Sequence, residues 1–361
     1  MGWLKRTFLY REDYIPALQG LRGLAVLWFF HWSFYAQFDP AKLSRITEGK
    51  AWMGAALDAV ALCLSPAMMA PVAAYVLAGF LAQTTLGTRP LAGFLLSRAA
   101  RFYPVFLATV LPILAYSARG WSDIAWVLTF FIVPQDIPPG HLLILAKAFW
   151  FSLLWAVILA ATGRTRRFLV QALPFLAVAG LEYLVYRDLR TTSAFLAVLA
   201  GAAAARHPLP EAVAHRTAGP SLVCATLAAP IFLASTPGAS FLLALAGAAL
   251  LALVAGSLAS GVPSFTARLL SHPVLRYFGA VALPFFLIHT TWGFRLSRSI
   301  LQGEMHSLSA ILAHYAMSLA FSTVFAGFLH VFFERPRFLR NLRNATAADR
   351  NPRSATQGVS P

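Results

Sequence analysis

Ten apolar stretches, separated by short segments rich in proline, glycine or charged residues, take up most of this 361-residue sequence. Charged residues make up only 12% of the chain and hydrophobic residues 59%, whereas a soluble domain holds about a quarter charged residues. The sequence therefore predicts an all-α, polytopic integral membrane bundle of about ten transmembrane helices, with little sequence left for a soluble catalytic domain. The predicted spans are 17–38, 67–86, 101–118, 142–163, 168–186, 192–205, 220–235, 239–259, 278–294 and 308–333.

Several of these spans contain proline, which removes a backbone donor and disturbs a helix. We expect such helices to be kinked and packed inside a bundle, where neighbouring groups satisfy the carbonyls that lose their donor. The prolines concerned are Pro71, Pro104, Pro112, Pro174 and Pro284. A further apolar stretch, 121–134, is too short to span and is expected to lie in the membrane interface.

The 29 lysines and arginines outnumber the 13 aspartates and glutamates and give a net charge of +16. The basic residues form short clusters between apolar stretches, so we expect no nucleic-acid partner. They gather in alternate loops, which is typical of the cytoplasmic side of a membrane protein. This pattern predicts that both termini are cytoplasmic and that the polar segment 344–361 is a disordered tail. No removable signal peptide is expected.

Ionisable side chains inside apolar spans are costly, so each is a candidate functional residue. Arg22 and His31 lie in the first span, nine residues apart, which on a helix corresponds to about 13.5 Å and opposite faces. Arg22 alone can also extend to the lipid headgroups. His289, followed by two threonines in the ninth span, is either a hydrogen-bonded packing residue or a general base.

Arg98 and Arg101 stand three residues apart on one helical face. They are either a positive anchor at the cytoplasmic side or a pair of guanidiniums that bind phosphates or a carboxylate. The remaining charged or histidine residues of the spans are interpreted as packing, headgroup-facing or locally paired: Lys147, Glu182, His314, His330 and Glu334. The two cysteines, Cys63 and Cys224, indicate neither a disulfide framework nor a zinc site, and we expect no metal.

These signals occur in a recognisable order along the chain. The segments that carry it are YIPALQGLRGLAVLWFFHWSF, AYVLAGFLAQTT, SRAARFYPVFLATV, VLRYFGAVALPFFLIHTTWGF and FFERPRFLRNL. In these segments, from about residue 14 to residue 343, the chain resembles the membrane-bound acyltransferase-3 family, whose members O-acylate bacterial surface sugars and other hydroxyl acceptors. The resemblance implies about ten helices in residues 1–343, the bacterial cytoplasmic membrane and cytoplasmic acyl-CoA as donor.

The chain departs from the family pattern at three positions. The family usually has a histidine eleven residues after the arginine of the first span, where this sequence has Ser33, and the nearby histidine is His31. The acid expected in the fourth span is replaced by Ala148, beside Lys147. The serine of the usual SGF is Ala78.

The resemblance implies transfer of an acyl group, with acetyl expected, from acyl-CoA to a hydroxyl of a carbohydrate or lipid-linked glycan. We expect Arg22, Arg98 and Arg101 to attract the phosphates of the donor. His31 is the first candidate for the base that takes the hydroxyl proton, and His289 orients the substrate or the base. Two alternatives remain: a non-catalytic relative that moves or senses an amphiphile, and a proton-coupled transporter.

The predicted orientation is tested by placing single cysteines at 40–50 and at 300–306 in a cysteine-free background. Both segments follow an odd number of predicted spans, so a membrane-impermeant reagent added from outside the cell is expected to label them. Labelling from the cytoplasmic face only would overturn the orientation.

Overall fold

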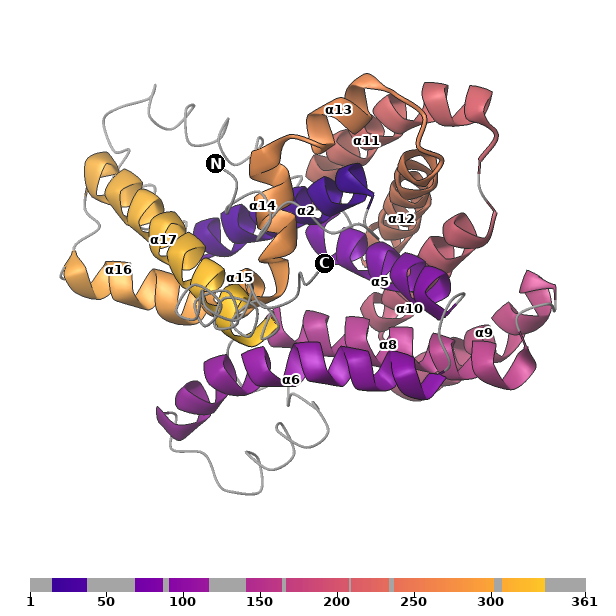
Figure 1. Ribbon diagram of the computed structural model, residues 1–361, viewed down its shortest axis with the longest axis horizontal. Coiled ribbons are helices and arrows are strands. Elements are labelled where there is room, and N and C mark those ends of the chain that lie inside the picture. Colours follow the sequence, from indigo (N-terminus) through magenta and orange to yellow (C-terminus); the bar gives the residue numbers. More distant parts are fainter. Residues whose placement is uncertain are drawn as a thin grey trace, which may run out of the picture.

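The computed structural model of the protein describes residues 15–37, 69–86, 91–116, 141–163, 167–207, 209–233, 237–301 and 307–334 (Figure 1). Within these residues the regular elements are helices and no strand occurs, as the sequence predicts. The long helices are α2 (Pro16–Tyr35), α5 (Ala70–Leu86), α6 (Leu91–Tyr116), α8 (His141–Thr162), α9 (Phe168–Tyr186), α10 (Leu189–Arg206), α11 (Glu211–Leu233), α12 (Pro237–Ala259) and α17 (Leu308–Leu329). Shorter helices are α13 (Phe265–Leu270), α14 (Pro273–Ala280), α15 (Ala282–Ile288), η3 (His289–Gly293), α16 (Phe294–Ile300) and η4 (His330–Glu334).

Each of the ten predicted spans coincides with at least one helix, but ten membrane crossings are not confirmed. Five helices of the described residues are long and apolar enough to cross a membrane, or six if one bent pair counts as a single span. Their apolar segments are Leu91–Leu111, Ile144–Thr162, Phe168–Tyr186, Gly238–Ala259 and Ser309–Phe333. These helices are compatible with a multi-pass membrane protein. The expected interface segment 121–134 and the expected tail 344–361 lie outside the described residues.

The surface of α9 shows the apolar exposure expected of a helix that faces lipid. Leu169 is 75% exposed, Leu173 64% and Leu184 63%. In water so many exposed leucines on one helix would be unfavourable, whereas lipid chains are as apolar as the leucines themselves. The pattern supports a lipid-facing position for α9.

The predicted span 278–294 is not one continuous helix, which corrects the sequence-based expectation. Helical residues Pro273–Ala280 and Ala282–Ile300 meet at a bend of 68° around Val281. Proline has no N–H, so Pro284 cannot donate to the carbonyl four residues earlier, at Ala280. The helix therefore ends at that carbonyl and restarts, and the N–H of Phe285 bonds to the Val281 carbonyl at 2.9 Å.

The backbone of α2 lies directly against α13 and α14 (Figure 1). A Cβ atom at Gly20 would lie only 1.6 Å from the carbonyl oxygen of Leu270, and one at Gly23 only 1.9 Å from that of Leu275. No side chain larger than hydrogen fits at either position. The glycines of the LQGLRG segment thus determine how closely α2 approaches the broken helix.

The two largest apolar cores among the described residues both include side chains of α2. In one, aromatic side chains of α2, α6 and α15 pack together, including Phe30, Phe106 and Phe285, all fully buried. In the other, α5, α8, α9 and α10 pack around Trp155 and Phe175. In Figure 1, α16 and α17 lie on one side of α2 and α5, α10 and α12 on the other. Helix α2 therefore joins the two halves of the bundle.

A close glycine contact between α5 and α10 gives a stability prediction. A Cβ atom at Gly79 would lie 1.9 Å from the Val198 carbonyl oxygen, and nothing lies within 4 Å of the Cβ position at Gly180. We expect Gly79→Ala to destabilise the protein by about 1–3 kcal/mol or more, because the two helices must separate. Gly180→Ala is the matched control and is expected to leave stability unchanged or slightly raised. Thermal unfolding in detergent measures both, and equal midpoints would contradict the packing.

Candidate functional site

His31 of α2 is held by a tyrosine of the last long helix. The Tyr315 hydroxyl oxygen lies 2.7 Å from His31 Nδ1, and the two rings are stacked, with centroids 5.5 Å apart and an interplanar angle of 13°. Both side chains are half-buried. The sequence analysis singled out His31 but not Tyr315, since no local pattern marks a partner 284 residues away.

His289 is enclosed in the first core. Its side chain is 1% exposed, and its Nδ1 lies 2.9 Å from the carbonyl oxygen of Phe286 and 3.2 Å from that of Phe285. Carbonyl oxygens only accept hydrogen bonds, so Nδ1 carries the hydrogen. A charged ring is unfavourable at a site closed to water, and in the neutral ring the lone pair is then on Nε2. The aromatic rings around it belong to Phe29, Phe30, Phe285, Phe286 and Phe294.

The two histidines meet the same aromatic side chain. The Phe30 ring centroid lies 5.9 Å from that of His31 and 6.1 Å from that of His289. The Phe30 ring thus contacts two histidines that are 258 residues apart in the sequence.

The local backbone at His289 is a π-helical segment, η3. The N–H of Phe294 bonds to the carbonyl of His289, five residues earlier. Such segments occur frequently at functional sites. A Cβ atom at Gly293 would lie 2.1 Å from Ser322 Oγ, so this glycine lets η3 pack closely on α17. The π-helical turn η3 therefore forms where this segment packs against α17.

Ser33 and Arg22 occupy other positions on α2. Ser33 is half-buried two residues after His31, and two residues turn a helix by about 200°, so the two side chains leave α2 on different faces. Arg22 is half-buried near the start of the helix. Because α2 is one continuous helix, Arg22 and His31 are separated by about 13.5 Å along it, as the sequence predicts.

Arg98 links α6 to α8. Its Nη1 donates a hydrogen bond to Ser152 Oγ at 3.1 Å, and its guanidinium carbon lies 4.9 Å from the centre of the Phe94 ring. Ser152 is buried and in turn donates to the Phe149 carbonyl at 2.9 Å. Arg98 is therefore packed between two helices and does not only extend toward lipid headgroups. The backbone of Arg101 belongs to the same helix, and its side chain lies outside the described residues.

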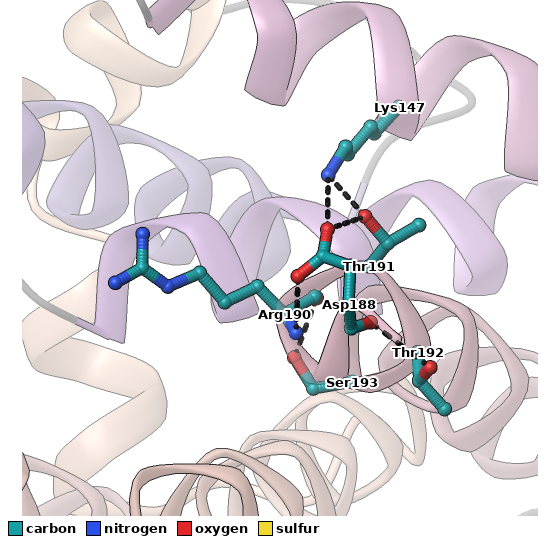
Figure 2. A network of polar contacts seen from close by, with 6 residues as sticks. All are labelled: Lys147, Asp188, Arg190, Thr191, Thr192 and Ser193. Carbon is teal, nitrogen blue, oxygen red and sulfur yellow. Dashed lines mark hydrogen bonds and ion pairs between the residues drawn. The ribbon is translucent and has the colours of Figure 1, made fainter. Parts of the chain in front are cut away.

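A charged cluster that the sequence analysis did not assemble joins α8 to the start of α10 (Figure 2). Lys147 Nζ lies 3.5 Å from Asp188 Oδ2 and donates to the Thr191 hydroxyl, which donates to Asp188. Asp188 also accepts from the N–H of Arg190 at 2.9 Å and so caps α10. The sequence analysis interpreted Lys147 as extending to the headgroups, and the structure adds that its ammonium has an anionic partner in the turn between α9 and α10.

The turn between α9 and α10 positions this cluster. Arg187 ends α9 in a left-handed conformation with φ of 54°, and Asp188 follows as the cap of α10. Glu182, near the end of α9, is within electrostatic range of both Asp188 and Lys147. Ala148, at the position where the acyltransferase-3 resemblance would predict an acid, is buried in the second core. Asp188 in the turn and Glu182 near the end of α9 thus place two carboxylates near Lys147 of α8.

His314 and two serines form a second polar cluster, between α16 and α17. Ser297 Oγ lies 2.7 Å from His314 Nδ1 and 2.6 Å from Ser318 Oγ, and these side chains are fully buried. Ser322, one turn further along the same face of α17, is also buried, but its hydroxyl has no hydrogen-bond partner among the described residues. This cluster connects the last two helices of the bundle and agrees with the interpretation of His314 as a packing residue. The backbone of Glu334 ends η4, but its side chain and any partner of it lie outside the described residues.

Comparisons with known proteins leave the family open. No family model, no curated protein and no solved structure matches the chain. Among the described residues no group of three or more histidine, cysteine, aspartate or glutamate side chains is arranged to hold a metal ion.

The pH dependence of the Lys147–Asp188 contact is a testable consequence. Burial alone would raise the pKa of the Asp188 carboxyl, but its hydrogen bond from Thr191 and the charge of Lys147 outweigh burial and hold the pKa below the ordinary 3.8. A lowered pKa means that the carboxylate stabilises the fold above about pH 3.8 and that this contribution disappears as the pH falls through the lowered pKa.

We therefore expect wild type to be more stable than Asp188→Asn at neutral pH, with the difference shrinking below about pH 4. Thermal unfolding across this range measures the difference. Glu211→Gln, which removes an exposed carboxylate from the first turn of α11, is the matched control and should change stability less. A wild-type advantage that does not vary with pH would contradict the ion pair.

Proposed function

We propose that the protein is a membrane O-acyltransferase. In this proposal it moves an acyl group, acetyl in the first instance, from cytoplasmic acyl-CoA to a hydroxyl of a carbohydrate or other surface-linked acceptor. The proposed location is the bacterial cytoplasmic membrane, with both termini in the cytoplasm and a lipid-linked or surface glycan presented from the other side. The order of motifs along the sequence supports the proposal, and so do the apolar helices of the fold.

The observation that carries the proposal is the placement of His31. It is a half-buried imidazole inside an apolar bundle, fixed by Tyr315 through one nitrogen and with its other nitrogen not occupied by any described residue. Acyl transfer needs such a group at the reacting carbonyl or at the attacking hydroxyl.

The reaction is an addition followed by an elimination. The acceptor hydroxyl oxygen attacks the thioester carbonyl carbon, its proton passes to a histidine, and the carbonyl electron pair moves to oxygen. When the tetrahedral intermediate collapses, the carbon–sulfur bond breaks and the CoA thiolate takes the proton back from the histidine. One group must therefore accept a proton and another must stabilise the oxyanion. His31 and His289 are the proposed pair.

Donor binding is assigned in this proposal to Arg22, Arg98 and Arg101. A guanidinium presents a planar fork of N–H donors that matches two oxygens of a phosphate. Arg98 is already oriented by Ser152 and by the Phe94 ring, and an oriented fork loses less entropy when it binds. This orientation supports a role in binding beyond that of a charged anchor.

A proton-coupled transporter is a second candidate, and two observations favour it. Broken helices and charged residues within membrane segments are both typical of transporters. The bundle has a 68° break between α14 and α15, and it has the Lys147–Asp188 pair with Glu182 nearby. A non-catalytic relative that senses or moves an amphiphile would share these features. Both alternatives predict that no acyl group leaves acyl-CoA.

The deciding experiment uses purified protein in proteoliposomes with radiolabelled acetyl-CoA and a panel of glycan acceptors. We expect label to appear in an acceptor, and His31→Ala to lower turnover by about 10²–10⁴-fold because it removes a group that acts in the transition state. His215→Ala, which removes an exposed histidine of α11, is the matched control and should retain activity. Absence of transfer to every acceptor by correctly folded wild type would rule out the acyltransferase.

A further inference from the structure

One carboxyl group near the Lys147–Asp188 pair lacks a partner of its own. Glu182 of α9 is half-buried, and its Oε2 atom is closed to water and has no hydrogen-bond partner among the described residues. An ionised oxygen at such a position is unfavourable unless a charge or a donor compensates it. An added positive charge at Glu182, either a cation or a proton, would remove this cost.

The cation and the hydroxyl hydrogen of the cluster are already used by Asp188 (Figure 2). Lys147 Nζ lies 3.5 Å from Asp188 Oδ2. The Thr191 hydroxyl lies near both carboxyl groups, but it has a single hydrogen and donates it to Asp188. The described charges that act on Glu182 are those of Asp188 and Lys147. With two acids against one lysine, a fully ionised cluster would carry one negative charge in excess.

The arginines of the turn between α9 and α10 do not compensate Glu182. The Arg187 guanidinium carbon lies 5.7 Å from the centre of the Tyr183 ring. Arg190 bonds to Asp188 through its backbone N–H, and Figure 2 shows its guanidinium directed away from that carboxylate. The excess negative charge therefore stays within the cluster.

Tyr75 of α5 is independent evidence that the cluster takes a further group. Its side chain is only 7% exposed, and its hydroxyl lies within electrostatic range of Asp188. Among the described residues this hydroxyl forms no hydrogen bond. A phenol can donate a hydrogen bond to a carboxylate but brings no positive charge. Helices α5, α8, α9 and α10 thus converge on a site with a single cation.

An aromatic layer closes the cluster toward the middle of the bundle. One helical turn from Lys147 and Thr191, the rings of Phe151 and Phe195 are stacked with centroids 3.7 Å apart. These rings have no polar atom that could pass a proton on. The side chain of Asp188 is 37% exposed and lies beyond the apolar segment of α9. The cluster therefore exchanges with water at the end of the bundle where the α9–α10 turn lies.

We infer that the Glu182–Asp188 pair binds one exchangeable proton, which resides on Glu182 while Lys147 bonds to Asp188. A proton needs no cavity, and it removes the excess negative charge without any other ligand. When the proton leaves to water, both carboxylates compete for the ammonium of Lys147. The link from α8 to the α9–α10 turn then depends on proton binding. The inference does not depend on the proposed acyl transfer.

The proton is detected without any substrate by infrared spectroscopy of the full chain in lipid nanodiscs, because a protonated carboxyl and a carboxylate have different carbonyl stretching bands. At about pH 6.5 an ordinary glutamate, with a pKa of about 4.3, is almost fully ionised. We expect wild type to show a protonated carboxyl band at this pH that is absent from Glu182→Gln. Glu211→Gln, which removes an exposed carboxylate of α11, is the control and should keep the band. A wild-type spectrum without this band would overturn the inference.

Two variants test whether the pair and Lys147 act on the same proton. Asp188→Asn removes the neighbouring negative charge, so we expect the Glu182 band to disappear about one pH unit or more lower than in wild type. Lys147→Met removes the ammonium, and the band should persist to about one pH unit or more higher. Lys147→Arg keeps the charge and should shift the band less than Lys147→Met. A band that moves in neither Asp188→Asn nor Lys147→Met contradicts a shared site.

The matched control for these shifts is Arg190→Gln. It removes a positive charge from the same turn but keeps the N–H that bonds to Asp188, so the Glu182 band should not move. A shift as large as that of Lys147→Met would contradict the role of Lys147.

Replacing choline by sodium at constant pH separates a proton from a metal cation. We expect the Glu182 band to be the same in both salts. Loss of the band in sodium would show that the carboxylates take a metal cation in place of the proton, and the inference would then be wrong.

Discussion

Inside an apolar helical bundle a polar side chain has little water to bond with, so it bonds either to a backbone carbonyl of its own helix or to a partner on a neighbouring helix. The described residues show this repeatedly. His31 pairs with Tyr315 between α2 and α17, Lys147 with Asp188 between α8 and the start of α10, and Ser297 with His314 between α16 and α17. Because each contact joins two helices, these polar groups also contribute to which helices pack together.

The broken helix formed by α14 and α15 provides backbone geometry that a regular helix cannot provide. The break at Val281 directs α15 into the aromatic core, and the π-helical turn that follows carries His289. In both places the cause is local: Pro284 removes a donor, and Gly293 permits close contact with α17. The irregular backbone therefore lies where α15 and η3 pack against α17, and this packing holds it in place.

Sequence reasoning located the helices well and the polar partners poorly. Apolar runs mark helices because hydrophobicity accumulates over many residues, and the predicted span 168–186 has the bounds of α9. Helix α6 begins at Leu91 rather than at 101 because charged residues such as Arg98 are accommodated by contacts with α8, which no hydropathy pattern reveals. Asp188 and Tyr315 were missed for the same reason. Each depends on a helix far away in the sequence.

The acyltransferase-3 pattern has its first-span histidine at the position of Ser33, two residues after His31. The contact of His31 with Tyr315 shows what this difference in position means for the side chain. Two residues turn α2 by about 200°, so a side chain at Ser33 leaves the helix away from Tyr315, whereas His31 meets its hydroxyl. A histidine at either position would lie at nearly the same depth, since two residues advance a helix by only about 3 Å. What differs is which neighbouring helix contacts the imidazole. The partner on α17 thus supports a functional role for His31 that its register in the sequence alone would not.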